Sequence, residues 1–289
     1  MSFFRPKAYY RPTDLDEAVS LLSAHGKSAR LLAGGTDLLI QRPPTVEILV
    51  DIRSLGLHTI KKDEQGGLAI GAATPVEALE REEALAVGPH RALLEAAESM
   101  ATPTIRNMAT IGGNLCNASP AGDLCVALTA LGAVVLIAGS KGRREIPITG
   151  FFLSPNATAL QEDELVAEIR IPSFPEGAGS SFLKLRHHQT SVDIAIVNVA
   201  SRLRTQDGRC AEAVLSMGAV GPTPLRATRA EALLTGQRMS EELLNRAAQA
   251  AMEESAPIDD IRASAEYRRK MVAVLMKTSL ETSLRRCGA

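Results

Sequence analysis

Two glycine motifs are the parts of this chain whose residue types and order could bind a ligand. The first covers residues 33–38 (Ala-Gly-Gly-Thr-Asp-Leu), and the second covers residues 110–115 (Thr-Ile-Gly-Gly-Asn-Leu). Because glycine has no side chain, the backbone N–H groups of such turns can approach an anion closely. Each motif also carries a hydroxyl and an amide or a carboxylate. Together they predict a site for one ligand with two phosphates, which we interpret as a dinucleotide.

The second motif continues into a polar run that supports this interpretation. Its side chains suit the hydroxyls of a ribose or a ribityl chain. They are Thr110, Asn114, Asn117, Ser119 and Asp123. Apolar residues at 108–109 and 124–126 frame the run, which favours the lining of a pocket. The alternatives are an exposed polar loop for this run and a plain tight turn for the first motif.

Several common kinds of site find no support in the sequence. The GxGxxG fingerprint of Rossmann folds and the GxxxxGK[ST] phosphate loop are both absent. The four cysteines are too few for a disulfide framework and show no metal-binding spacing, so we predict no metal site. His187 and His188 have no evident carboxylate partner, and we interpret them as the end of a strand.

Composition and charge narrow the class of protein. The 289 residues are 45% hydrophobic and 22% charged, with a formal net charge of −1. Lys and Arg are scattered, which argues against nucleic-acid binding. No apolar run approaches the roughly 20 residues of a membrane span, and the N-terminus lacks the apolar core of a signal peptide. The sequence therefore predicts a cytoplasmic protein without a membrane span.

Hydrophobic periodicity predicts three units, at about 1–57, 58–175 and 176–289. The first contains a helix at 14–25 capped by Thr13, strands at 29–33 and 46–52, and a short helix at 38–40. The second contains a hairpin at 59–62 and 68–71, a helix from Pro75 capped by Thr74, helices at 92–100 and 122–131, and strands at 134–138, 144–148 and 165–171. The third follows a linker at 173–179.

The third unit changes pattern from strands to helices. Its predicted strands lie within 182–188, 194–204 and 211–218, and its helices lie at 229–234, 240–252 and 265–286. This order predicts an α+β unit with a three-stranded antiparallel sheet that helices cover on one face. The fold class of the chain as a whole is α+β.

The two glycine motifs together resemble the signature of the FAD-binding medium subunit of the molybdenum hydroxylases. This family includes xanthine dehydrogenase and carbon monoxide dehydrogenase. The resemblance covers nearly the whole chain, and residues 114–123 are close to the xanthine dehydrogenase form. It implies a two-part FAD-binding domain at 1–175, with the fold of vanillyl-alcohol oxidase and p-cresol methylhydroxylase. An α+β C-terminal domain at 176–289 follows it.

The resemblance also implies which residues hold FAD. The N–H groups of Gly34, Gly35, Thr36 and Asp37, flanked by Leu32, Ala33 and Leu38, would hold the pyrophosphate. Thr110, Gly113 and Asn114, beside Ala109, would form a second clamp. Asn117, Gly122 and Asp123 would contact ribityl or ribose hydroxyls, and Leu165 would touch the flavin or adenine region.

Lys184 would approach the isoalloxazine from the C-terminal domain, where its charge would favour the reduced, anionic flavin. The alternative is a strand residue whose amine reaches solvent.

Some residues depart from the family pattern. Xanthine dehydrogenase places a Phe over the flavin, and Met100 stands at that position here. Methionine can also pack against a ring, but the stacking and the access of NAD⁺ would differ. The cysteine-rich insertion of 4-hydroxybenzoyl-CoA reductase is absent, so we interpret Cys116 and Cys125 as small buried residues.

The implied function is that of an FAD-carrying electron-transfer subunit. A large subunit with the molybdenum cofactor would oxidise the substrate, and a small subunit would pass electrons through two [2Fe–2S] clusters to FAD. The acceptor would be NAD⁺, a quinone or oxygen, and the heterotrimer would be doubled. Such a subunit needs no catalytic residue of its own. The alternatives are a self-contained flavin oxidoreductase of the same fold, such as a UDP-N-acetylmuramate-forming reductase, and a non-catalytic nucleotide-binding regulator.

Overall fold

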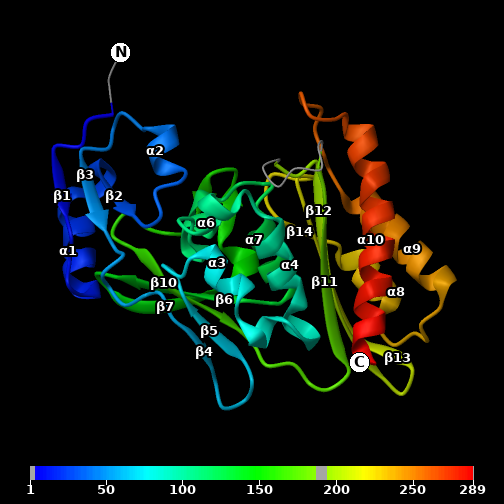
Figure 1. The fold of residues 1–289 in the computed structure, drawn as a ribbon. Coiled ribbons are helices and arrows are strands. Elements are labelled where there is room, and N and C mark those ends of the chain that lie inside the picture. Colours follow the sequence, from blue (N-terminus) through cyan, green and yellow to red (C-terminus); the bar gives the residue numbers. More distant parts are fainter. Residues whose placement is uncertain (1–3, 187–193, 289) are drawn as a thin grey trace.

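The first part of the chain folds into a small parallel sheet with one helix packed on it (Figure 1). The computed structural model describes residues 4–186 and 194–288. The strand order is β1-β3-β2, and both outer strands run parallel to β3. The elements are β1 (Ala8–Tyr10), α1 (Leu15–His25), β2 (Ala29–Leu32), α2 (Leu38–Gln41) and β3 (Ile48–Asp51). Strand β1 is too short to have been predicted.

Two predicted helix caps are wrong. Asp14 caps α1 in place of Thr13, and its carboxylate accepts the Glu17 N–H at 2.8 Å. The helix predicted to start at Pro75 starts at Val76, and Thr74 does not cap it, because the Thr74 hydroxyl donates to a backbone carbonyl. The sequence pattern locates a helix start, but it does not show which of two adjacent residues turns toward the free N–H groups.

Asp51 ends β3 fully buried and is held by two neighbours. The Arg53 guanidinium donates to its carboxylate over 2.6–3.1 Å, and the hydroxyl of Tyr9 on β1 donates as well. Burial by itself would raise the pKa of this carboxyl, but the bonds from Arg53 and Tyr9 outweigh it and hold the pKa well below its usual range.

We expect Asp51→Asn to make the stability of the chain less sensitive to acid. A carboxyl with a lowered folded-state pKa stabilises the fold above its unfolded-state pKa, and this contribution is lost as the pH falls toward the folded-state value. The free energy of unfolding of the wild-type chain should therefore fall more steeply below about pH 4 than that of the variant. Urea denaturation at a series of pH values measures both slopes. Equal slopes would show that Arg53 and Tyr9 do not hold Asp51 in its ionised form.

The second part of the chain is built on an antiparallel sheet of five strands in the order β4-β5-β10-β6-β7. The central strand, β10, is the last of these in sequence and occupies the predicted residues 165–171. The strands are β4 (Ile60–Lys62), β5 (Leu68–Gly71), β6 (Val134–Gly139), β7 (Gly142–Pro147) and β10 (Leu165–Ile171), with a separate pair β8 (Phe152–Ser154) and β9 (Ala157–Thr158). The helices are α3 (Val76–Glu80), α4 (Arg91–Ser99), α5 (Pro103–Arg106), α6 (Ile111–Asn117) and α7 (Asp123–Ala130).

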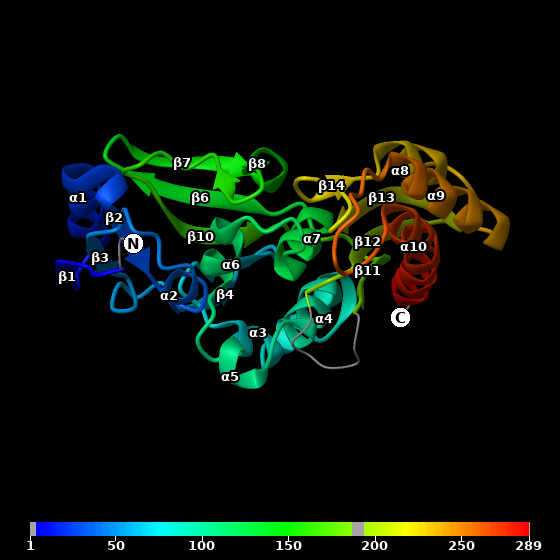
Figure 2. The same cartoon turned by 90° about the horizontal axis from the view of Figure 1, so that it is seen from above.

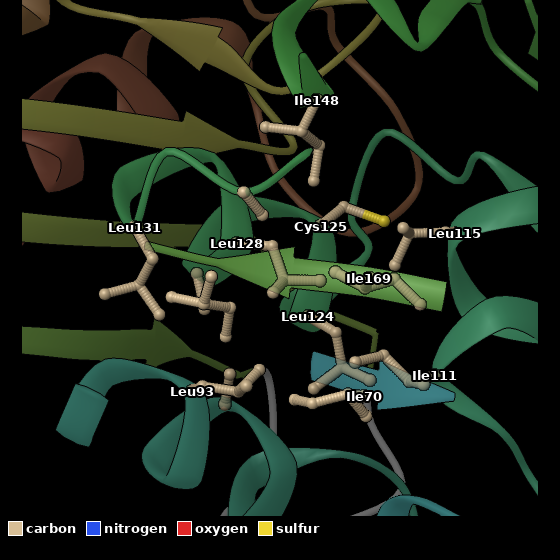
Figure 3. Close-up of a cluster of buried hydrophobic side chains, with 14 of the residues drawn as sticks. Ile70, Leu93, Ile111, Leu115, Leu124, Cys125, Leu128, Leu131, Ile148 and Ile169 are labelled. Carbon is tan, nitrogen blue, oxygen red and sulfur yellow. The ribbon is translucent and has the colours of Figure 1, made fainter. Parts of the chain in front are cut away.

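The largest core of the molecule lies between this sheet and α4, α6 and α7. Figure 3 shows Ile111 and Leu115 of α6 packed beside Leu124 of α7 and Ile169 of β10. These four side chains are fully buried, and each such burial stabilises the fold by about 1.5–3 kcal/mol. Apolar packing on α7 and β10 therefore fixes the helix that carries the second glycine motif.

The third part is an antiparallel sheet of four strands with helices on both faces. The predictions of three strands and of helices on only one face are therefore wrong. The sheet has a fourth strand, β14, which is too short for its periodicity to show. Its elements are β11 (Ala178–Leu185), β12 (Val197–Gln206), β13 (Arg209–Gly218), β14 (Leu225–Arg226), α8 (Thr228–Leu234), α9 (Glu241–Glu254) and α10 (Ala265–Cys287). Helices α8 and α10 cover one face, and α4 and α7 of the preceding part cover the other (Figure 2).

Alternation along the strands divides the side chains between these two faces. On β12, Val199 and Leu203 join the core under α10, whereas Ala200 joins the core of the second part. On β11, Phe182 also faces the second part. Lys184, two residues further on, therefore points toward α4 and α7. Among residues 4–186 and 194–288, no helix is long and apolar enough to cross a bilayer.

Candidate functional site

The fold packs the first glycine motif against residues 108 and 109, which directly precede the second motif. A β-carbon on Gly34 would lie 1.8 Å from the carbonyl oxygen of Met108, just before the second motif. The nearest atoms, which belong to Met108 and Ala109, are all backbone atoms. They cannot rotate away, so there is no room for a side chain at position 34. Glycine at this position is therefore required by the close approach of the first and second parts of the chain.

The first motif forms the predicted turn between a strand and a helix. It connects β2 to α2, and Gly35 has a φ of +70°, which glycine adopts without strain. Within the part of the chain that the structure describes, the backbone N–H groups of residues 34–37 donate to no protein group. Four successive N–H groups without a protein acceptor are available to an anionic ligand.

The second motif was predicted as a turn, but it is the beginning of a helix. Thr110 caps α6, and its hydroxyl accepts the Gly113 N–H at 3.0 Å. The N–H groups of Ile111, Gly112 and Asn114 donate to the carbonyls of residues 74, 72 and 110, respectively. The motif can therefore contact a ligand through the exposed backbone of Gly113, but the N–H groups of residues 111–114 are already bonded. Gly112 lets α6 pack closely, because a β-carbon there would lie 2.6 Å from a carbonyl oxygen.

Several predicted residues gather around α6. Asn114 donates from its amide to the sulfur of Met100 at 3.5 Å. Asn117, at the end of α6, accepts a 3.0 Å bond from Gln41 of α2. Gly122 precedes α7, where a β-carbon would lie 2.9 Å from the sulfur of Cys125. These contacts connect the second motif to Met100 and to α2, the helix that follows the first motif.

Lys184 and Asp123 form a buried ion pair between the second and third parts. Their Nζ and Oδ2 atoms are 2.6 Å apart, and each side chain is 4% exposed. The alternative in which the Lys184 amine reaches solvent is therefore wrong. Burial raises the pKa of Asp123, and the contacts with Lys184 and Asn198 oppose that rise. Since the two charges face each other, the pair presents a dipole rather than a free cation.

Asn198 completes this pair and was not predicted. It lies opposite Lys184 on β12 and donates to Oδ1 of Asp123 at 2.7 Å and to the carbonyl of Ala121 at 3.3 Å. Gly218 leaves room for its amide, because a β-carbon there would lie 2.2 Å from Oδ1 of Asn198. The sequence feature that could have indicated this role is that Asn198 is the single polar residue in the run 194–200.

Other predicted residues are placed differently. The side chain of Leu165 is fully buried beside Ala138, so only its backbone could contact a ligand. Cys116 is exposed, which corrects its interpretation as a buried residue, whereas Cys125 is buried. Burial raises the pKa of the Cys125 thiol, which makes it unreactive. His187 and His188 lie outside the described residues.

Comparison with known proteins identifies the family. Residues 3–174 match the model of the FAD-binding domain in molybdopterin dehydrogenase, and residues 182–283 match that of the CO dehydrogenase flavoprotein C-terminal domain. The chain belongs to the FAD-binding medium subunits of the molybdenum hydroxylases. The free N–H groups of residues 34–37 suit the pyrophosphate of FAD.

Individual members of this family align over almost their whole length. The xanthine dehydrogenase FAD-binding subunit of Escherichia coli O157:H7 is 32% identical, over 97% of each chain. The carbon monoxide dehydrogenase medium chain of Hydrogenophaga pseudoflava is 33% identical, over 97% of this chain and 98% of the relative. A solved structure of carbon monoxide dehydrogenase from H. pseudoflava superimposes with a TM-score of 0.92 at 34% identity, covering 98% of both chains. The predicted fold class is confirmed.

Proposed function

We propose that this chain is the FAD-carrying electron-transfer subunit of a molybdenum-containing hydroxylase or dehydrogenase. The observation that carries the proposal is the set of free N–H groups at residues 34–37. Gly34 in this set packs on Met108 and Ala109, which directly precede the second motif. When bound, FAD supplies the redox chemistry, because it can accept electrons singly and release them in pairs. The chain itself holds, orients and shields the cofactor.

The residues divide this task among them. Gly34, Gly35, Thr36 and Asp37 would donate N–H groups to the pyrophosphate, between Leu32–Ala33 on one side and Leu38 on the other. Around α6, the surface beside the cofactor would consist of Ala109, Thr110, Gly113, Asn114 and Asn117. Met100 would lie against the flavin, with Gly122, the backbone of Leu165 and the Asp123–Lys184 pair near its ribityl or ring end.

The relatives suggest how electrons reach and leave this chain. They are subunits of xanthine and carbon monoxide dehydrogenases, which implies a large and a small partner. We propose that the large partner holds the molybdenum cofactor and that the small partner delivers electrons from [2Fe–2S] clusters. The doubled heterotrimer, the cytoplasmic location and an acceptor such as NAD⁺, a quinone or oxygen belong to the same proposal.

The binding of different flavins tests the role of the first motif. The purified chain is incubated with FAD or with FMN and passed through gel filtration, and its visible spectrum is recorded. FAD should be retained in stoichiometric amount and displaced by ADP, whereas FMN should be lost because it lacks the pyrophosphate that the N–H groups would bind. Equal retention of FMN and FAD would contradict the pyrophosphate site. No retention of FAD by the chain would overturn the proposed cofactor role.

A further inference from the structure

The turn between α4 and α5 has a backbone that is unusual for its sequence. Ala101 has a φ of +45°, in the left-handed region that a β-carbon disfavours. The preceding residue, Met100, is the one whose sulfur contacts Asn114 of the second motif. Such a conformation persists where the surroundings determine it, and it is more frequent at ligand sites than elsewhere.

Arg106 holds this turn from the end of α5. Its Nη1 donates to the carbonyl of Met100 at 2.9 Å and to that of Ala101 at 3.1 Å. The same guanidinium pairs with Glu80 of α3, and the two side chains are 11% and 20% exposed. The planar fork of arginine can serve both carbonyls and the carboxylate at once, which the single ammonium of a lysine cannot do.

Two further cations hold the turn from the C-terminal sheet. Lys184 Nζ and Arg186 Nη2 donate to the carbonyl of Ser99, at 3.3 and 3.0 Å. The carbonyls of three consecutive residues, 99–101, are thus bonded by three cationic side chains, one at the end of α5 and two at the end of β11. Cations are favoured at this position because the C-terminal end of α4 carries partial negative charge. The turn is therefore fixed from both the second and the third part of the chain.

We propose that Arg106 is a positioning residue for FAD, acting through Met100; this inference rests on the proposed function. Methionine is flexible, with three rotatable bonds, and makes favourable contacts with aromatic rings. A fixed backbone limits the positions that its sulfur can reach. Arg106 fixes both carbonyls that flank the Met100–Ala101 step and so determines where the Met100 side chain begins. The contact between Asn114 and the Met100 sulfur then directs the side chain along the second motif.

A double-mutant cycle tests whether Arg106 acts through Met100. The FAD dissociation constants are measured by titrating the apo chain of the wild type, Arg106→Ala, Met100→Ala and the double variant. Arg106→Ala should weaken FAD binding by at least about tenfold in the wild-type background, as expected for two lost charge-assisted hydrogen bonds. In the Met100→Ala background it should cause less than about a twofold further loss.

Two other variants separate this role from a general effect on folding. Arg106→Lys keeps a charge beside Glu80 and should recover part of the affinity, because lysine can bond one carbonyl. Arg81→Ala removes an exposed arginine that pairs with Glu77 and should leave FAD binding unchanged. An equal loss from Arg106→Ala in both backgrounds, or no loss, would overturn the positioning role while FAD still binds to the wild type. Failure of the wild type to bind FAD would overturn the proposed function, and this inference with it.

Discussion

Gly34→Ala should abolish the retention of FAD and lower the free energy of unfolding by about 3 kcal/mol or more. The added β-carbon would lie 1.8 Å from the Met108 carbonyl oxygen and 2.6 Å from its carbon. Neither atom belongs to a side chain that could rotate away, so the first motif must separate from the segment that leads into the second motif. Since both motifs are proposed to face the same cofactor, separation would damage the site as well as the fold. Urea denaturation and the visible spectrum after gel filtration measure the two effects.

A matched substitution distinguishes this clash from the loss of any glycine. A β-carbon on Gly150 would make only ordinary contact with the side chain of Ile146, at 3.5 Å. Gly150→Ala should therefore change the free energy of unfolding by less than about 0.5 kcal/mol and leave FAD retention intact. If Gly34→Ala behaved like this control, the close packing of the first motif on Met108 would be disproved.

Much of the secondary structure could be predicted from the sequence because local patterns determine it. Strand β10 and helices α8, α9 and α10 lie within a few residues of their predicted bounds. The second glycine motif was misjudged because two glycines usually break a helix. Here Thr110 caps the helix, and burial of Ile111 and Leu115 offsets the cost of the glycines. The boundaries at residues 57 and 175 remain predictions.

The candidate site was only partly predictable because its contacts join residues far apart in the sequence. The motifs indicate the ligand class, since glycine and polar residues have clear local roles. No local pattern indicates that Lys184 meets Asp123, because this depends on how β11 and β12 pack on α7. The roles of Asn198 and Arg106 depend in the same way on register and on helix packing. Where helices of one part cover the sheet of another, the sequence of neither part reveals the contact.

Lys184→Met should lower the free energy of unfolding by about 3–5 kcal/mol, because it leaves the Asp123 carboxylate buried without the cation that is bonded to it. Among residues 4–186 and 194–288, Asn198 would then be the remaining side chain that bonds Asp123, and one amide does not replace an ammonium at 2.6 Å. The loss should be measured by urea denaturation of the FAD-free chain, so that cofactor binding does not contribute. The packing of the C-terminal sheet on α7 should weaken along with the pair.

Removal of both charges should be tolerated better than removal of one. In Asp123→Asn/Lys184→Met no uncompensated charge remains, so much of the lost stability should return. Lys270→Met, which breaks an exposed pair with Glu266, should leave the denaturation midpoint unchanged because surface ion pairs contribute little. If the double variant were as unstable as Lys184→Met, the buried charge of Asp123 would not be the cause of the loss. The cost would then come from the bond between Lys184 and Ser99, and the carbonyl turn at residues 99–101 would be the structure that Lys184 maintains.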